Sequence, residues 1–148
     1  MLVLKWIFRR FMGFQVYIYR SSGGKRMGHL RGMPILLLIT TGRKSGKVRV
    51  TPVMYIKDQE NYVITASNNG AEQNPGWFHN LEANPLNSIE VEGARMSVKA
   101  RRATSEEKDR LWQILIGRAS FFEDYRKRAR RNIPMVILEP NDTKNSDD

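Results

Sequence analysis

The stretch Thr40–Pro52 reads TTGRKSGKVRVTP and follows an apolar run. It contains several groups that can bind an anion. Its glycines let the backbone turn tightly and expose N–H groups, and its serine adds a hydroxyl donor. An arginine can grip a phosphate with its two-pronged guanidinium, and lysines add point charges. These residues are Gly42, Arg43, Lys44, Ser45, Gly46, Lys47, Arg49 and Thr51. The pattern predicts a pocket for a polyanion, although a solvated basic hairpin tip would explain the same residues.

The spacing GxxxxGK[ST] of a Walker loop is absent, so this is not a nucleotide P-loop. The chain has no cysteine, which excludes disulfides, thiol catalysis and thiolate metal sites. The two histidines, His29 and His79, lack metal-ligand spacing, and we expect no metal. A chain without disulfides fits a reducing cytoplasm.

The positive charge is concentrated in the first part of the chain. The 148 residues carry a net charge of +10, and the first acidic residue is Asp58. Residues 1–57 contain twelve Lys or Arg, whereas the rest is close to neutral. Such a distribution favours a phosphate-bearing ligand, a nucleic acid or an anionic membrane surface.

The elements that must position the turn read as antiparallel strands. Pro34–Thr41 is a nearly continuous apolar run, typical of a strand buried on both faces. Lys47–Lys57 alternates and Tyr62–Ser67 returns, which predicts a three-stranded meander. Pro52 lacks a backbone N–H, so it indicates a sheet edge or a bulge.

The remainder predicts helices around a sheet. Its expected elements are a short helix Gly76–Ala83 capped by Asn74, a hairpin Asn87–Glu92 and Ala94–Ala103, a helix opened by the capping box of Thr104 and Glu107, a second helix Phe121–Arg131 and a strand Pro134–Leu138. We therefore expect a mainly β, α+β fold: a small barrel with helices packed outside.

We expect three parts: an N-terminal helix with a connector (1–33), a barrel domain (34–140) and a disordered polar tail (141–148). The longest run of uncharged residues in the N-terminal stretch is too short to span a bilayer. As a helix it is basic and amphipathic, with one apolar face made of Leu4, Ile7, Phe8, Phe11, Phe14 and Ile18. Two interpretations stay open: residues 1–20 lie on an anionic membrane surface, or the apolar face packs on the domain.

Three segments carry a family resemblance. LLLITTGRKSGKVRVTPVMYI and VITASNNGAEQNPGWFHNLEANP, followed by the closing IPMVILEP, resemble the deazaflavin (F420)-dependent nitroreductase family over roughly residues 34–140. The resemblance implies a split β-barrel of the FMN-binding type and an oxidoreductase that uses reduced coenzyme F420. That coenzyme carries a phosphodiester and a tail of glutamates, which gives the basic turn a ligand.

The resemblance also implies cofactor-binding residues. Arg43 to Lys47 match the family's phosphate-binding turn, and Arg49, Thr51 and Pro52 match the strand along the cofactor. The segment by the deazaflavin ring corresponds to Thr65, Ala66, Ser67 and Asn68. The helix start that closes the site corresponds to Pro75, Gly76, Trp77, Phe78 and Asn80. Packing or capping roles would also explain Trp77 and Asn80.

The acceptor side differs from the nitroreductase branch. Three tyrosines of that branch match Ala119, Phe122 and Tyr125, so only Tyr125 keeps its hydroxyl. We expect Ser67, Tyr125 and Phe122 to act at the reacting end, with Tyr125 as a proton donor and Phe122 as an apolar wall. The loss of the two tyrosine hydroxyls at positions 119 and 122 puts reduction of bulky nitroaromatic compounds in doubt and favours a quinone or an enone as the acceptor.

Three alternatives differ in the ligand. A split barrel could bind FMN, a related protein could carry the cofactor or another amphiphile without turnover, and a basic domain could bind nucleic acid. We expect no nucleic acid, because the strands show no stacked-aromatic surface. The sequence leaves the oligomeric state open.

Overall fold

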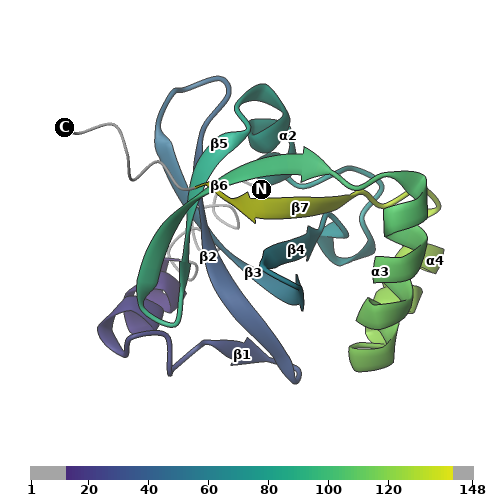
Figure 1. Cartoon of the computed structure of the whole chain (residues 1–148), viewed down its shortest axis with the longest axis horizontal. Helices are drawn as coiled ribbons and strands as arrows, with labels where there is room; N and C mark the ends of the chain where they lie inside the picture. The colour runs from purple at the N-terminus through teal and green to yellow at the C-terminus, as the bar shows by residue number, and fades with distance from the viewer. Residues whose placement is uncertain (1–12, 142–148) are drawn as a thin grey trace, which may run out of the picture.

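The computed structural model describes residues 13–141, and its centre is a closed barrel of antiparallel strands (Figure 1). A helix over residues 13–21 precedes the barrel. The further elements are β1 (His29–Leu30), β2 (Met33–Thr41), β3 (Val48–Asp58), β4 (Asn61–Thr65), the 3-10 turn η1 (Asn68–Gly70), α2 (Gly76–Ala83), β5 (Leu86–Val91), β6 (Ala94–Arg102), α3 (Ser105–Arg118), α4 (Phe121–Ala129) and β7 (Met135–Pro140).

The strands confirm the expected α+β barrel and its meander. Their order is β1-β2-β3-β4-β7-β6-β5, and β2 also pairs with β5, with Leu38 opposite Ile89, which closes the barrel. Pro52 lies opposite Leu37 in the part of β3 that pairs only with β2, since β4 joins at Tyr55. The free edge beside Pro52 is the edge that its missing N–H predicts.

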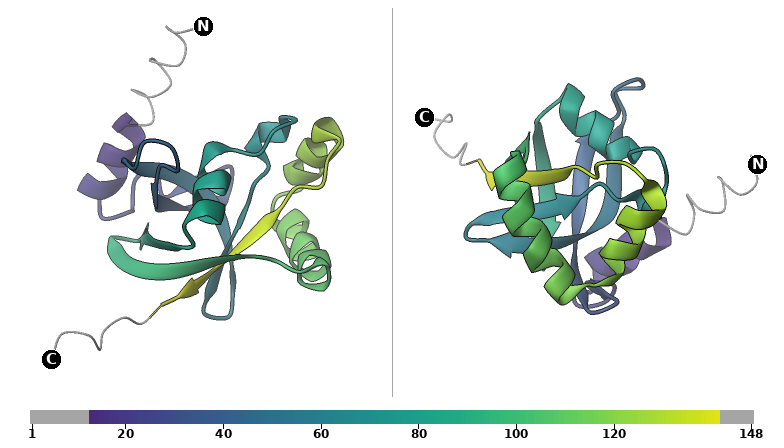
Figure 2. Two further views of the ribbon diagram at one scale, coloured as in Figure 1. Left: turned by 90° about the horizontal axis from the view of Figure 1, so that it is seen from above. Right: turned by 90° about the vertical axis from the view of Figure 1, so that its right-hand side faces the viewer.

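Strand alternation builds two cores. Ile64 and Leu138 point into the barrel, where they join the first buried cluster. Their neighbours Val63 and Ile137 point outward and pack with α3 and α4 in a second cluster. The two helices cover one side of the barrel, as Figure 2 shows. Because both strand faces are buried, these strands read as continuous apolar runs.

The predicted capping box of α3 is present. The Thr104 hydroxyl accepts from the Glu107 N–H at 3.2 Å, and the Thr104 N–H donates to the Glu107 carboxylate at 3.0 Å. Arg101 donates two further bonds to that carboxylate, at 2.7 and 2.8 Å. Hydrogen bonding from Arg101 and from the Thr104 N–H lowers the pKa of Glu107 from 4.5 to about 2.

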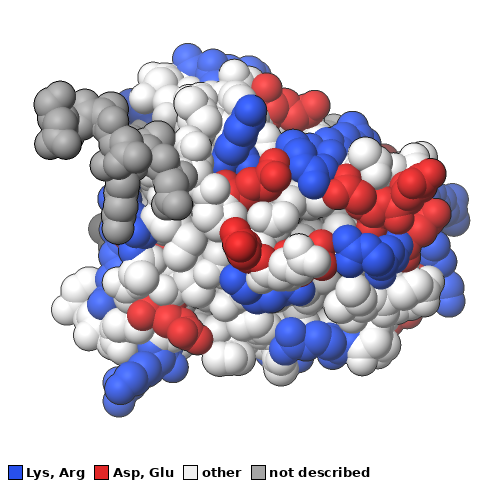
Figure 3. Space-filling model, viewed as in Figure 1, with Lys and Arg blue, Asp and Glu red and all other residues white. Residues whose placement is uncertain are grey.

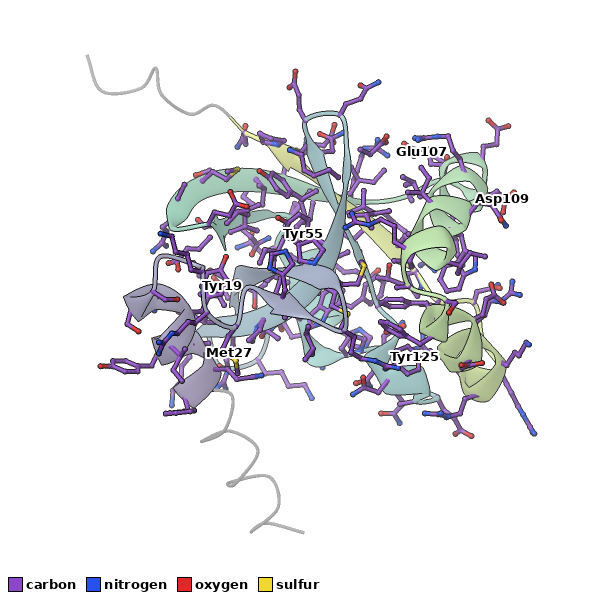
Figure 4. All side chains as sticks on the ribbon, turned by 90° about the horizontal axis from the view of Figure 1, so that it is seen from below. Tyr19, Met27, Tyr55, Glu107, Asp109 and Tyr125 are labelled. Atoms are coloured by element: carbon purple, nitrogen blue, oxygen red, sulfur yellow. The ribbon has the colours of Figure 1, made fainter. Side chains whose placement is uncertain are left out.

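The helix over residues 13–21 is attached to the barrel by Tyr19 and Arg20. The buried Tyr19 hydroxyl donates to the Glu90 carbonyl at 3.2 Å and accepts from the Glu92 N–H at 3.1 Å. Burial raises the pKa of Tyr19, which keeps the hydroxyl protonated. Arg20 forms a two-pronged ion pair with the Glu90 carboxylate at 3.0 Å. Figure 4 shows Tyr19 between the helix and the barrel.

The sequence left open whether the apolar face of this helix packs on the domain or contacts a membrane. Phe14, which belongs to that face, is 59% exposed and does not pack on the barrel. The polar hydroxyl of Tyr19 and not a wholly apolar stripe fixes the helix, because it satisfies two backbone groups at the end of β5. The other expected face residues before Gly13, and the tail after Asn141, lie outside the described residues.

Two local predictions also differ from the structure. Pro75, and not Asn74, is the N-cap of α2, and the Asn74 side chain instead accepts a hydrogen bond from Arg131. The connector contains the unpredicted strand β1, which forms a tight hairpin with β2. The contact of Asn74 depends on Arg131, which lies far away in the sequence. Strand β1 is too short to show periodicity.

Candidate cofactor cleft

A cleft of about 1010 Å³ joins the basic turn to the aromatic start of α4. Its walls come from the β2–β3 turn, β3, the loop from β4 to α2, α4 and the N-terminal segment. Of the residues expected in the site, those lining the cleft are Arg43, Lys44, Ser45, Arg49, Thr51, Pro52, Thr65, Ser67, Asn68, Pro75, Gly76, Trp77, Asn80, Phe122 and Tyr125. Four expected residues are not among the lining residues: Gly46, Lys47, Ala66 and Phe78.

The basic turn has a defined backbone shape. The Gly42 N–H donates to the Lys47 carbonyl at 2.7 Å, and the Gly46 N–H donates to the Gly42 carbonyl at 2.8 Å. Gly46 has a φ of +69°, which favours glycine. A Cβ on Gly42 would lie 2.7 Å from the Ser45 hydroxyl oxygen. Gly46 is therefore favoured for a conformational reason, whereas a Cβ at Gly42 would require the Ser45 hydroxyl to move.

Asn80 holds the start of the turn. Its side chain is buried, its amide oxygen accepts from the Arg43 N–H at 3.1 Å, and its amide nitrogen donates to the Thr40 hydroxyl at 3.3 Å. Asn80 comes from α2, so it fixes the turn to a helix that also borders the cleft. The side chain thus supports the turn and also lines the cleft.

The cations of the turn are available to a ligand. Arg43, Lys44, Lys47 and Arg49 are exposed, and within residues 13–141 none of them has a carboxylate partner within 4.0 Å. The blue side chains at the upper edge of Figure 3 lie where the β2–β3 turn projects in Figure 1. Like charges held this close without counterions repel each other, so an anion with several charges would relieve the repulsion. This donor set fits a phosphate followed by carboxylates.

Ser67 lines the cleft where β4 gives way to an unusual turn. Asn68, Asn69 and Gly70 all have positive φ, of 48°, 54° and 81°. Asparagine and glycine tolerate this region better than other residues. The Ser67 hydroxyl makes no hydrogen bond to another described group and lines the cleft, so it can address a ligand.

Arg131 holds the loop that carries Ser67, and sequence reasoning missed it. Its guanidinium donates to the carbonyls of Ala66 at 3.0 Å, Ala71 at 3.0 Å and Gln73 at 3.2 Å, and to the Asn74 side chain. Burial lowers the pKa of Arg131. The sequence offers no signal for this role, because Arg131 is one of several cations at the end of a basic helix.

The aromatic end of the cleft lies on α4. Phe122 and Tyr125 both line it, with ring centroids 5.6 Å apart in an edge-to-face arrangement. Phe122 is otherwise buried in the second core cluster, whereas Tyr125 is half-buried (Figure 4). Ala119 is buried and does not line the cleft. Tyr125 is therefore the hydroxyl that α4 contributes.

The N-terminal segment forms a wall that the sequence interpretation did not place there. Gln15 and Val16 of the first helix line the cleft, as does Leu30 of β1. Val48 and Met54 of β3 also line it. The alternation of β3 could have indicated these last two, but nothing local places the N-terminal residues across the cleft. Among residues 13–141, no group of acidic or histidine side chains could hold a metal ion.

A closed antiparallel barrel with one cleft that joins a basic turn to aromatic residues of α4 is a split barrel suited to an anionic cofactor. A family model described as F420H(2)-dependent quinone reductase matches residues 11–140, and the chain belongs to this family. The chain is therefore an F420H(2)-dependent oxidoreductase, which confirms the resemblance to deazaflavin-dependent enzymes, the expected enzyme class and coenzyme F420 as the cofactor.

Two kinds of relative agree with this membership. The chain is 39% identical over 146 residues to an F420H(2)-dependent quinone reductase of Mycobacterium tuberculosis strain H37Rv, covering 92% of this chain and 97% of the relative. A solved F420-H2 dependent reductase (FDR-A) is 32% identical with a TM-score of 0.66, covering 75% of this chain and 98% of that structure. A structure described as a domain-swapped dimer is 28% identical with a TM-score of 0.68, covering 92% and 98%.

Proposed function

We propose that this chain reduces a quinone with a hydride from reduced coenzyme F420 bound in the cleft. One observation carries the proposal: a single cleft connects uncompensated cations at the β2–β3 turn to Ser67 and Tyr125. A ligand with a charged tail and a flat ring would contact both ends at once. The name of the Mycobacterium tuberculosis relative supports a quinone as the acceptor.

The turn would bind the tail and the loop would orient the ring. Arg43, Lys44 and Ser45 are placed for the phosphodiester, and Arg49 is placed for carboxylates further along β3. Ser67 is placed for polar atoms of the ring, and Trp77 offers a half-buried aromatic wall. These roles limit the motion of both reactants and exclude water, which is how a protein assists a cofactor reaction.

Tyr125 would complete the reduction. The bound coenzyme supplies a hydride, and the quinone must also gain a proton to become a hydroquinone. In this proposal the Tyr125 O–H bond breaks as an O–H bond forms on the quinone oxygen, and the tyrosine is reprotonated from water. The apolar surface of Phe122 would hold the acceptor ring against the cleft wall.

A titration followed by turnover tests the proposal. The purified chain is titrated with oxidised coenzyme F420 and, separately, with FMN, using fluorescence quenching. Loss of the reduced coenzyme is then followed with menadione, cyclohexenone and a nitroimidazole. We expect micromolar binding of F420, weaker binding of FMN and fastest turnover with menadione. Binding without turnover would favour a cofactor carrier, and tighter binding of FMN would overturn the cofactor assignment.

We also propose that the N-terminal helix contacts a membrane surface, where quinones are dissolved. Phe14 and Tyr17 are 59% and 69% exposed on the described part of this helix, beside a chain with an excess of cations. Within residues 13–141, none of the helices has the length and apolarity to cross a bilayer. Exposed aromatic side chains together with positive charge are typical of a helix that lies on an anionic surface.

Vesicle sedimentation tests the membrane contact. We expect the full chain to sediment with anionic vesicles and a Phe14→Gln/Tyr17→Gln variant to sediment less. Leu86→Gln is a matched control, because Leu86 is 56% exposed but lies on β5. Equal sedimentation of the double variant and the unchanged chain would remove the proposal without affecting the cofactor assignment.

A further inference from the structure

A two-residue hairpin turn places Arg31 at the edge of the cleft. Leu30 pairs with Met33, so Arg31 and Gly32 are the two central residues of the turn between β1 and β2. Their φ angles are +52° and +80°, as a type I′ turn requires. This turn type matches the twist of the flanking strands, and it leaves the Arg31 side chain free to reach outward from the tip.

Arg31 reaches α4, 94 residues away in the sequence. Its guanidinium carbon lies 3.8 Å from the centre of the Phe121 ring, and its Nη1 donates to the Tyr125 hydroxyl oxygen at 3.1 Å. Phe121 in turn lies edge-to-face with Tyr125, with centroids 5.6 Å apart. Phe121 thus forms a platform that holds the guanidinium while the guanidinium holds the tyrosine.

The hydrogen bond fixes what the tyrosine hydroxyl can do. A phenol oxygen can accept a hydrogen bond and still donate its own hydrogen. Because Arg31 can only donate, its bond occupies an acceptor position of the Tyr125 oxygen and leaves the hydroxyl hydrogen for another partner. Another cation, Arg128, lies 5.9 Å from the centre of the Tyr125 ring and makes its hydrogen bond elsewhere, to the Asn69 carbonyl.

We propose that Arg31 is a positioning residue that holds Tyr125 with its hydroxyl hydrogen available to the acceptor in the cleft. The inference rests on the proposed proton donation by Tyr125. The same contact holds the β1–β2 hairpin against α4, which keeps the exposed Leu30 in the cleft wall. Within the described chain β1 has only two residues and pairs only with β2, so the contact of Arg31 with α4 adds a long-range support to this hairpin.

Kinetics of a double-mutant cycle test the catalytic part. We compare Arg31→Ala, Tyr125→Phe and the combined variant, with menadione as the acceptor. Arg31→Ala should lower kcat by ~10-fold, a fraction of the ~100-fold or more that general acids contribute, and leave the Kd of coenzyme F420 within ~2-fold. In the Tyr125→Phe background the same change should have no further effect. Arg31→Lys should restore part of kcat, because an ammonium also donates.

Hydrogen exchange of the coenzyme-free protein tests the contact itself. Arg31→Ala and Tyr125→Phe should both speed amide exchange in residues 28–35, and Arg31→Ala more so because it also loses the Phe121 contact. Lys25→Ala is the matched control: it removes one cation from the same connector, and its side chain makes no hydrogen bond in the described structure.

Each outcome decides the proposal. An equal fall in kcat with and without the Tyr125 hydroxyl, or a parallel loss of coenzyme affinity, would overturn the positioning role. Unchanged exchange in Arg31→Ala would overturn the contact. If the unchanged chain neither binds nor oxidises the reduced coenzyme, the proposed function fails and the catalytic role of Arg31 fails with it, whereas exchange still reports whether the hairpin is held.

Discussion

Charge reversal at Lys44 tests the anion-binding role of the turn most directly. Lys44 lines the cleft, is exposed, and has no carboxylate partner among the described residues. Lys44→Glu should therefore leave the fold intact, since no ion pair is broken. It replaces an attraction to the coenzyme tail by a repulsion of similar size, so the change in binding free energy is about twice the contribution of one exposed cation.

The size of the effect follows from the exposure of the turn. An exposed ion pair contributes ~0.2–1 kcal/mol. Reversal of one charge should therefore cost ~0.4–2 kcal/mol, which raises Kd by about 2- to 30-fold. The Debye length falls from ~10 Å at 0.1 M salt to ~3 Å at 1 M, so high salt should remove most of the difference.

Fluorescence titration of oxidised coenzyme F420 at low and high salt measures this change. The matched control is Lys25→Glu, which makes the same change of charge in the connector, away from the cleft lining. We expect the control to raise Kd much less. An equal rise of Kd in both variants would show that only the net charge matters, and an unchanged Kd in Lys44→Glu would refute the assignment of the turn.

Three other substitutions have defined expected results. Glu107→Gln should lower Tm at pH 7. The pKa of Glu107 is about 2 in the folded chain against 4.5 ordinarily, so the Tm difference between the unchanged chain and the variant should shrink in thermal scans as pH falls from 4.5 toward 2. Gly42→Ala should displace the Ser45 hydroxyl and weaken coenzyme binding ~3- to 10-fold by titration, whereas Gly117→Ala, which meets nothing within 4 Å, should not. Arg131→Met should lower the free energy of unfolding by ~1–3 kcal/mol in urea, because several carbonyls lose their donor, and should speed exchange in the loop that carries Ser67; unfolding and exchange like those of the unchanged chain would remove its supporting role.

Local chemistry explains the predictions that succeeded. Thr104 and Glu107 are three residues apart and satisfy each other's backbone groups within one helical turn, so their pattern needs no distant partner. Pro52 indicated a free sheet edge for a similarly local reason. Continuous apolar runs and alternating segments predicted strands β2 to β7.

Distant partners explain the predictions that failed. Asn74 precedes a proline at a helix start and reads as a cap, but Arg131 engages its side chain from 57 residues away. Tyr19 attaches the first helix through two backbone groups at the end of β5, and no local pattern indicated these partners. A strand of two residues such as β1 carries no periodic signal at all.

The division of the chain into three parts stays a prediction, as do the individual roles of the cleft residues. The tertiary structure adds where these residues lie relative to one another. Ser67 and Tyr125 border the same cleft although they belong to a strand end and a helix, and Arg31 reaches the tyrosine from the opposite end of the chain.

The sequence by itself determined strands β2 to β7, the capped helix α3, the basic turn and, through its family resemblance, the cofactor. These depend on residues within a few positions of each other, where spacing fixes geometry. Only the tertiary structure decided that β2 also pairs with β5 to close the barrel, that Arg131 supports the loop beside Ser67, and that the N-terminal segment borders the cleft. Such contacts join residues tens of positions apart, and their free energy comes from burial and hydrogen bonds that no local pattern encodes.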